Sequence, residues 1–340
     1  MAELACLTPG ASSAQRAGIN RQHRLNTTSR TGARGYAALK RLAYAAGEPL
    51  LRRAASAYVP GPALEDALHW ASVRAPAGVS FTFGYFNAEH EAATLVARKT
   101  LETIQTLAKL PNPAGNAVSA FTENTLGHAG SSAGYCSLKA PALNYEAQTL
   151  HLLAQHASKH GQRLHFDSHG PETAEPTLKA LETLYPHYPR LGLTIPGRWA
   201  RSPSDAAWAA KRNLRVRVVK GQWPCPQTAD RDPREGFLAV IDSLAGRVQE
   251  VAVATHDAVL AQEAARRLTA RGTAFELELL CGLPRRAALA RARSEQWKVR
   301  LYVPFGQAWL PYALGQVLRQ PALWPRLLMD SMAGARRGGA

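Results

Sequence analysis

The chain has 340 residues, of which 46% are hydrophobic and 19% are charged, so it has enough apolar material for a substantial core and is not a mostly disordered protein. Its length fits one large α/β barrel or two ordinary domains, and no apolar run is long enough for a transmembrane helix. The formal net charge of +16 raises nucleic acid or an anionic membrane surface as possible partners.

The N-terminal part of the chain carries close to half of this charge. Residues 1–60 hold nine Lys and Arg against two Glu, a difference of +7. Residues 1–35 are rich in Ser, Thr, Gly and Arg without apolar periodicity, which predicts a basic, poorly ordered tail and no secretory signal. Residues 36–77 repeat Leu, Ala and Tyr on one face and are predicted to form N-terminal helices.

From residue 78 to residue 325, short β-branched or aromatic runs alternate with amphipathic stretches, and residues 326–340 form a predicted C-terminal tail. The predicted strands are 78–86, 134–140, 164–168, 191–197, 214–221, 248–257, 274–280 and 298–306. Helical stretches such as 146–160 and 258–272 separate them. Eight strand signals alternating with helices predict an α/β fold, a (βα)8 TIM-type barrel that follows the N-terminal helical segment. A doubly wound open sheet is the alternative, but no GxGxxG follows a predicted strand.

Four cysteines stand far apart, and none belongs to a CxxC pair. Neither a zinc ribbon nor a disulfide framework is therefore indicated, and we predict a reducing, cytoplasmic setting. The sequence has no RNA- or DNA-binding motif, and its basic tail lacks interleaved aromatic residues, so we predict no nucleic-acid partner.

Polar residues end several of the predicted strands, where a barrel of this type has its active site. An isolated polar residue at such a place is ordinarily a cap or half of an ion pair. Several cations on one face favour an anionic or electron-rich ligand, such as a phosphorylated cofactor. The candidates are Lys139, Asp167, Arg217, Lys220, Thr255, His256, Asp257, Glu276, Glu278, Arg300 and Tyr302.

Seven segments follow one another in a familiar order. They read GVSFTFGYF, CSLKAPAL, LHFDSHG, VRVVKGQW, VAVATHD, FELELLCGL and RLYVPFGQAWLPY. In this order, and at these predicted strands, they resemble the proline dehydrogenase family, FAD-dependent (βα)8 enzymes that include the catalytic domain of proline utilization A. The resemblance runs from about residue 52 to residue 319 and identifies the chain as a divergent member.

The resemblance implies an FAD site at the ends of the fifth to seventh strands. Arg217 matches the arginine beside flavin N5, and Lys220 matches the lysine of the VKG motif. Thr255 and His256 match a pair that contacts FAD, and Glu276 matches a glutamate near the ribityl or adenosine part. The resemblance also implies a quinone as electron acceptor and peripheral contact with a membrane, which would be the inner membrane. The basic N-terminal segment is compatible with anionic lipid.

Lys139, Asp167 and Tyr302 match substrate-side positions and, together with Arg217, are the predicted catalytic residues. In the family, a hydride passes from the carbon beside the ring nitrogen to flavin N5 and leaves an imine. Arg217 is expected to stabilise negative charge on the reduced flavin. Lys139 and Asp167 are expected to pair and to set the protonation state of the amine, although a simple buried ion pair is the alternative.

The sequence departs from the family where the substrate carboxylate is held. The family uses two adjacent arginines in Y-x-x-R-R-x-x-E, and this chain has Tyr312, Gly315, Gln316 and Arg319 at the corresponding positions. Losing two such contacts costs several kcal/mol of binding, at about 1.5–3 kcal/mol for each charged hydrogen bond. Trp223 replaces a tyrosine of the same pocket. Further departures from the family motifs are Pro196 and Glu278, each in place of a glutamine, and Asp257 in place of an asparagine. We predict that the substrate pocket has changed more than the cofactor site.

Three hypotheses follow from these departures. The first is an FAD-dependent amine dehydrogenase that acts on a proline derivative or another cyclic amine rather than on free proline. The second is an L-proline dehydrogenase of low efficiency, forming 1-pyrroline-5-carboxylate, and the third is a degenerate, non-catalytic member of the family.

A hypothesis from another class rests on the segment that ends the third predicted strand. His165, Asp167 and His169 are spaced two residues apart, and in a strand such residues share a face. Together they would suit a metal-dependent TIM-barrel hydrolase. The competing expectation, which we favour, is that no metal binds and that only Asp167 is catalytic.

Overall fold

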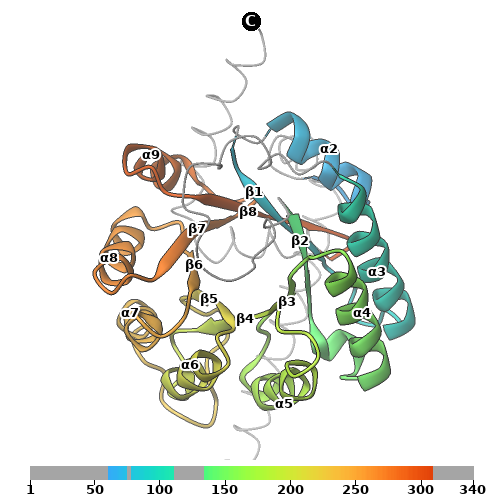
Figure 1. Cartoon of the computed structure of the whole chain (residues 1–340), viewed down its shortest axis with the longest axis horizontal. Coiled ribbons are helices and arrows are strands. Elements are labelled where there is room, and N and C mark those ends of the chain that lie inside the picture. Colours follow the sequence, from blue (N-terminus) through green and yellow to red (C-terminus); the bar gives the residue numbers. More distant parts are fainter. Residues whose placement is uncertain (1–59, 75–77, 111–133, 309–340) are drawn as a thin grey trace, which may run out of the picture. The chain divides into compact units, whose positions relative to one another are not determined.

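A computed structural model of the chain describes residues 60–74, 78–110 and 134–308, and within them eight parallel strands close into a barrel in chain order (Figure 1). Pairing of β1 with β8, in which Ser80 lies opposite Arg300, closes the ring. Every strand falls inside the range predicted for it, so the (βα)8 prediction is confirmed. The strands are β1 (Ser80–Tyr85), β2 (Gly134–Leu138), β3 (Leu164–Phe166), β4 (Leu191–Pro196), β5 (Arg215–Val219), β6 (Glu250–Ala254), β7 (Ala274–Leu280) and β8 (Val299–Phe305).

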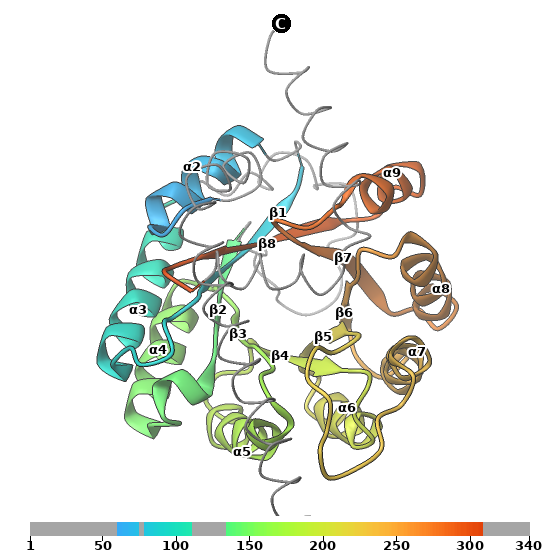
Figure 2. The same ribbon diagram turned by 180° about the vertical axis from the view of Figure 1, so that it is seen from behind.

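Helices surround the strands, as the two opposite views in Figures 1 and 2 show. They are α2 (Leu64–Arg74), α3 (Ala93–Lys109), α4 (Ala147–Lys159), α5 (Ala174–Leu184), α6 (Ser202–Lys211), α7 (Pro233–Leu244), α8 (Ala258–Thr269) and α9 (Arg286–Ser294), with short 3-10 helices η2 (Ala140–Leu143) and η3 (Pro171–Thr173). Of the predicted N-terminal helices, α2 is described. The tails predicted at 1–35 and 326–340 lie outside the described residues.

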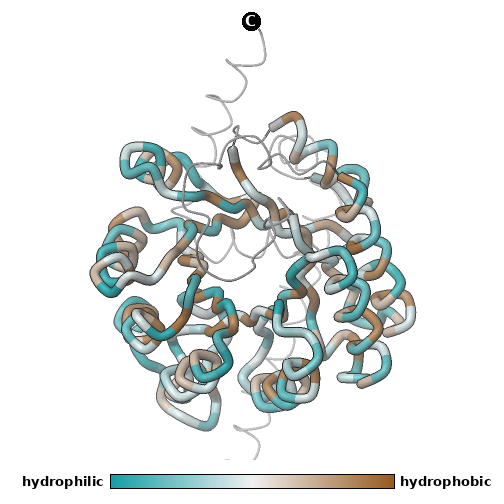
Figure 3. The backbone as a smooth tube through the Cα atoms, viewed as in Figure 1, coloured by the Kyte–Doolittle hydropathy of each residue, from teal (hydrophilic) through white to brown (hydrophobic). Residues whose placement is uncertain are grey.

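Some of the described helices begin at a residue whose side chain caps them, whereas α3, α5, α6 and α9 do not. Asp257 accepts hydrogen bonds from the backbone N–H groups of Val259 and Leu260 and so starts α8, and Asp232 caps α7 in the same way. Along α8 the buried positions recur every three or four residues, with Arg266 on the outer surface. Figure 3 shows the resulting mixture of apolar and polar residues along each helix. The buried apolar face of α8 packs against the barrel wall, and its cap fixes where the helix begins.

Residues of each strand alternate between two environments. Leu277 and Leu279 of β7 belong to the apolar layer between strands and helices, whereas Glu276 and Glu278 point into the barrel. The barrel interior is therefore rich in charge, although bulky branched residues usually fill such a barrel. Its buried charged side chains are Arg215, Arg217, Arg300, Glu276 and Glu278.

The end of β4 lies directly against the start of α7. A Cβ atom added to Gly197 would stand 2.6 Å from the carbonyl carbon of Gly236 and would also meet the backbone of Phe237. Because both partners are backbone, neither can move aside as a flexible side chain would. This close approach requires glycine and fixes the loop that follows β4.

We expect Gly197→Ala to lower the free energy of unfolding by about 1–3 kcal/mol, because the backbones must separate to admit a methyl group. Urea denaturation measures the change. Gly134→Ala is the matched control, since its added Cβ meets nothing nearer than Leu107 Cδ2 at 3.5 Å. Equal stabilities for the two variants would contradict the close approach.

Candidate active site at the C-terminal ends of the strands

Arg217 lies at the centre of the site, and β5 directs its guanidinium into the barrel. Its Nη1 atom donates to Asp167 Oδ1 at 2.5 Å, and its Nη2 atom donates to Glu278 Oε1 at 2.7 Å. A longer contact of 3.3 Å joins Nη1 to the hydroxyl of Thr194. Burial acts to lower the pKa of Arg217, but the charges of Glu278 and Asp167 outweigh it and raise the pKa above its ordinary value. The guanidinium is thus a fixed, permanent cation.

Tyr302 of β8 extends the same cluster. Its hydroxyl donates to Asp167 Oδ2 at 2.7 Å, and its ring centroid lies 5.0 Å from the Arg217 guanidinium. Burial and the neighbouring Asp167 carboxylate hold the pKa of Tyr302 well above its usual value, so the phenol remains a hydrogen-bond donor. A Cβ atom at Gly84 would collide with the Tyr302 ring, so glycine in β1 makes room for it. The structure therefore brings three of the four predicted catalytic residues into contact.

The fourth, Lys139, is placed differently from the prediction. Its Nζ atom donates to the backbone oxygen of Tyr85 at 3.2 Å and lies 3.7 Å from the ring centroid of Phe86. It forms no ion pair with Asp167, so the predicted pairing of these two described side chains is wrong. The reason is that the ammonium is already held by the Tyr85 carbonyl and the Phe86 ring. Burial lowers the pKa of Lys139 to about 8, and the Asp167 charge opposes that shift.

Three predicted cofactor residues keep groups that a ligand can use. The buried Nε–H of Arg217 has no acceptor among the described residues. Lys220, just beyond β5, pairs with no carboxylate of the described part. Its pKa is lowered mainly by burial and, to a smaller extent, by the nearby positive charge of Arg234. The Thr255 hydroxyl oxygen accepts from the backbone of Asp257 at 3.2 Å, which leaves its proton to donate. Two cations and a hydroxyl form a donor set that fits an anionic ligand rich in acceptors, such as FAD.

Two other predicted cofactor residues already have protein partners. The Nδ1 atom of His256 lies 2.7 Å from the Pro284 carbonyl oxygen, and its Nε2 atom accepts from the Leu280 backbone N–H at 3.0 Å. Only the face of its ring is left for a ligand. Glu276 is buried inside the barrel in ion pairs with Arg215 and Arg300. We therefore treat Glu276 as part of the barrel interior rather than as a cofactor ligand.

Aromatic residues lie at the mouth of the barrel. Trp223 stacks on His169, with ring centroids 4.8 Å apart and planes 26° apart. The indole N–H of Trp199 donates to the backbone oxygen of Trp223 at 2.9 Å, and Arg198 holds the same loop through Asp230 at 2.6 Å. The loop that carries the predicted substrate residue Trp223 is thus tied to the loop that follows β3.

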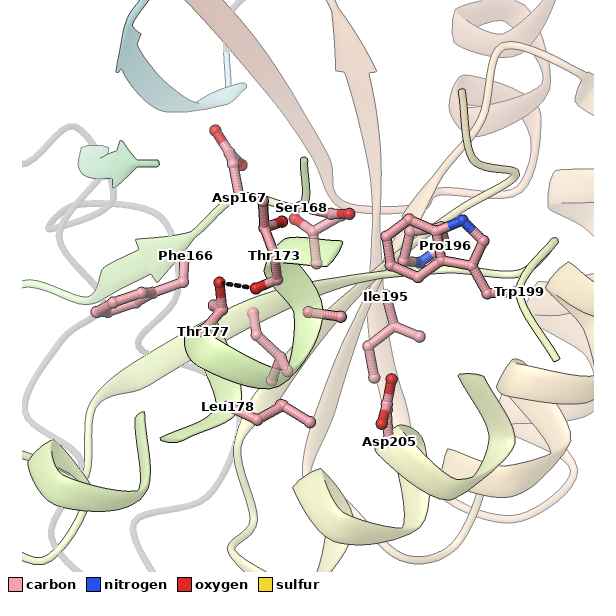
Figure 4. Close-up of a pocket in the computed structure, with 13 residues that line it drawn as sticks. Phe166, Asp167, Ser168, Thr173, Thr177, Leu178, Ile195, Pro196, Trp199 and Asp205 are labelled. Atoms are coloured by element: carbon pink, nitrogen blue, oxygen red, sulfur yellow. Dashed lines mark hydrogen bonds between the residues drawn. The ribbon is translucent and has the colours of Figure 1, made fainter. Parts of the chain in front are cut away.

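A small pocket, partly open to solvent, adjoins this cluster (Figure 4). It lies between the ends of β3 and β4 and helices α5 and α6, and its walls are mostly apolar. Asp167 and Thr194 line it and also contact Arg217, so the pocket and the central cluster share residues. Its other lining residues are Phe166, Ser168, Thr173, Ala174, Thr177, Leu178, Leu193, Ile195, Pro196, Trp199 and Asp205.

The metal hypothesis is not supported. The Nε2 atom of His165 lies 3.0 Å from the Thr194 hydroxyl inside the barrel, while His169 stacks on Trp223 at the mouth. Asp167, which lies between the two histidines in the sequence, already accepts hydrogen bonds from Arg217 and Tyr302. Across residues 60–74, 78–110 and 134–308, no three His, Cys, Asp or Glu side chains are grouped so as to hold a metal ion.

Glu278 belongs to the site, although the sequence patterns indicated it only as a strand-end candidate and as a departure from the family motif. Alternation along β7 was the available signal, since it places Glu276 and Glu278 on the same inward face. Four predicted substrate residues lie outside the described residues, namely Tyr312, Gly315, Gln316 and Arg319. No helix of the described part is long and apolar enough to cross a membrane.

Comparisons with known proteins find similar sequences and structures. No family model matches the chain. It is 27% identical over 176 residues to a proline dehydrogenase of Deinococcus radiodurans, a match that covers 48% of this chain and 56% of that protein. It is 23% identical over 260 residues to proline dehydrogenase 2 of Bacillus subtilis, covering 72% of this chain and 79% of that one.

Solved structures give the same fold. Proline utilization A from Bdellovibrio bacteriovorus matches with a TM-score of 0.65 at 16% identity, over 78% of this chain and 32% of that one. A variant of proline utilization A from Bradyrhizobium japonicum matches with a TM-score of 0.59 at 19% identity, over 82% and 32%. The chain thus spans about a third of these larger proteins and about half of the Deinococcus relative.

We expect the free energy of unfolding to fall as the pH is lowered from 7 to 5. Burial lowers the pKa of His256 to about 4, against about 6.5 in an unfolded chain. Because the folded-state pKa is the lower one, this stability is present above pH 6.5 and is lost as the pH falls towards 4. One such histidine contributes about 2 kcal/mol between pH 7 and pH 5.

Urea denaturation at the two pH values measures this loss, and His256→Asn should reduce it. Some pH dependence remains in the variant, because burial and nearby arginines also hold the pKa of His165 well below its usual value. An undiminished pH dependence in His256→Asn would show that His256 is not buried as a neutral ring.

Proposed function

We propose that the chain is a divergent member of the proline dehydrogenase family and acts as an FAD-dependent amine dehydrogenase. The observation that carries the proposal is the Arg217 guanidinium, which Asp167 and Glu278 fix at the end of β5. Its buried Nε–H has no acceptor among the described residues. A fixed cation with one unused donor suits a site in which negative charge develops on a bound ring.

We assign the holding of the cofactor to Arg217, Lys220 and Thr255. When bound, FAD supplies a two-electron acceptor for the hydride that leaves the substrate. Arg217 presents positive charge to that acceptor and needs no reorganisation, because both of its arms are already bonded. Lys220, unpaired within the described part, supplies a second cation for phosphate oxygens.

The substrate amine is proposed to lie near Asp167, whose carboxylate is oriented by Arg217 and Tyr302. A secondary amine can release a hydride from the carbon beside nitrogen only when its lone pair is free to form the C=N bond. The nitrogen must therefore lose its proton. Burial lowers the pKa of Lys139 to about 8, so a fraction of its amine is neutral at mildly alkaline pH, and only in that form can Lys139 receive the proton.

The proposed substrate is a proline derivative or another cyclic amine rather than free proline. What supports this is the replacement of the carboxylate-binding arginine pair by Gly315 and Gln316, which lie outside the described residues. L-proline dehydrogenase activity of low efficiency and loss of catalysis are the alternatives. The quinone acceptor, the peripheral membrane contact and the cytoplasmic setting stay predictions from the resemblance and the composition.

Arg217→Lys should lower kcat/KM by about tenfold or more in flavin-loaded protein, because lysine keeps the charge but loses the planar fork that spans two carboxylates. Steady-state oxidation of the best amine measures it, with a thermal melt to confirm folding. Arg291→Ala on α9 removes an exposed arginine paired with Glu295 and is the control. Full activity in Arg217→Lys would refute the assigned role.

Anaerobic bleaching of the bound flavin by a panel of amines tests the substrate class. We expect proline amide, proline esters or pyrrolidine to reduce the flavin faster than L-proline at equal concentration. Hydroxyproline and N-alkylated prolines complete the panel. The double variant Gly315→Arg with Gln316→Arg should raise the rate with L-proline, because it restores a bidentate carboxylate contact.

Fastest bleaching by L-proline would contradict the altered substrate class while leaving the flavoenzyme assignment intact. A flavin-loaded protein that no amine bleaches would instead favour the degenerate member.

A further inference from the structure

Glu278 has an unusual environment for a carboxylate. It lies on β7 with 2% of its side chain exposed, and its Oε1 atom accepts from Arg217 Nη2 at 2.7 Å and from the Thr82 hydroxyl at 3.0 Å. Its Oε2 atom is buried and has no hydrogen-bond partner within the described part. The Nη1 atom of Arg215 lies 3.9 Å from that oxygen.

Glu278 nevertheless carries its charge. Burial acts to raise the pKa of its carboxyl, but Arg217 and Arg215 outweigh that effect and leave the pKa below its usual value. Arg217 then has two anionic partners, Glu278 and Asp167, so these three side chains together carry one net negative charge. The motif that this strand resembles has a neutral glutamine at this position, so the extra charge is a property of this chain.

We propose that Glu278 is a positioning residue for Arg217 and that its charge limits the positive potential that Arg217 offers to a reduced flavin. This inference rests on the proposed function and deepens it. One arm of the guanidinium is held by Glu278 across the barrel from β7, and the other is held by Asp167 from the end of β3. Glu278 itself need not touch the cofactor to act in this way.

The substitution Glu278→Gln distinguishes the effect of holding Arg217 in place from the effect of the negative charge of Glu278. The amide oxygen can still accept from Arg217 and from Thr82, so the geometry is kept, while the negative charge is removed. Reduced flavin at neutral pH is anionic, so a more positive site should favour it. We expect the ratio of reduced to oxidised flavin at a fixed potential to rise at least tenfold, which is a shift of about 30 mV for a two-electron couple.

The experiment is a redox titration of the flavin-loaded full chain against a reference dye, with wild type, Glu278→Gln and Glu276→Gln compared. Glu276 is the matched control, because it lies on the same strand, is equally buried and pairs with Arg215 and Arg300 instead of Arg217. Its variant should shift the midpoint less than half as far. No shift in Glu278→Gln, or an equal shift in both variants, would overturn the proposal.

Thr82→Val provides a second measurement that does not alter the charged groups. Removing the hydroxyl that donates to Glu278 leaves its carboxylate less compensated, so the midpoint should move in the opposite direction and by less. A shift in the same direction as Glu278→Gln would count against the proposal. A wild-type chain that binds no flavin would overturn the proposed function, whereas flavin-loaded variants with unchanged midpoints would overturn this inference alone.

Discussion

A buried guanidinium held between two carboxylates is the constraint on which the rest of this structure depends. An unpaired charge inside a barrel would be strongly unfavourable, so Arg217 requires Asp167 and Glu278 to lie where they do. These partners come from strands that are not neighbours, and their contacts therefore run across the interior. Register, strand twist and the inward direction of alternate side chains must agree for all of these contacts to form at once.

Below this cluster lies a second one, in which Glu276 pairs with Arg215 and Arg300. The Tyr135 hydroxyl accepts a hydrogen bond from Arg215 there. Ionic packing thus replaces the branched apolar residues that commonly fill such a barrel. The deeper cluster fills the barrel interior, and the upper one faces the mouth, where a ligand can approach Arg217. Both clusters therefore consist of arginine–carboxylate pairs, at two depths along the barrel axis.

The sequence patterns predicted the fold well, because parallel strands buried on both faces are short β-branched or aromatic runs that stand out between amphipathic helices. They also placed Asp167, Arg217 and Tyr302 among the candidates at the C-terminal ends of the strands, but they did not predict that these three side chains contact one another. Two further features escaped prediction. Lys139 is held by the Tyr85 carbonyl and a phenyl ring rather than by Asp167, and both ring nitrogens of His256 are used inside the protein.

These misses share a physical origin. Periodicity tells which side of a strand a residue faces, but depth along the barrel axis depends on how neighbouring strands are staggered. Glu276 and Glu278 look alike in the sequence, yet only Glu278 reaches Arg217. Likewise, His165 and His169 share a nominal face, but one lies inside the barrel and the other at its mouth, so no metal site results.

The most direct test of the central assignment is the flavin content of the full chain purified in the presence of excess FAD. Absorbance of the protein-bound flavin, followed by release on denaturation, gives the ratio of cofactor to chain. If Arg217, Lys220 and Thr255 form a flavin site, the ratio approaches one FAD per chain and falls in Arg217→Lys. A folded wild-type chain that retains no flavin under saturating FAD would contradict the assignment.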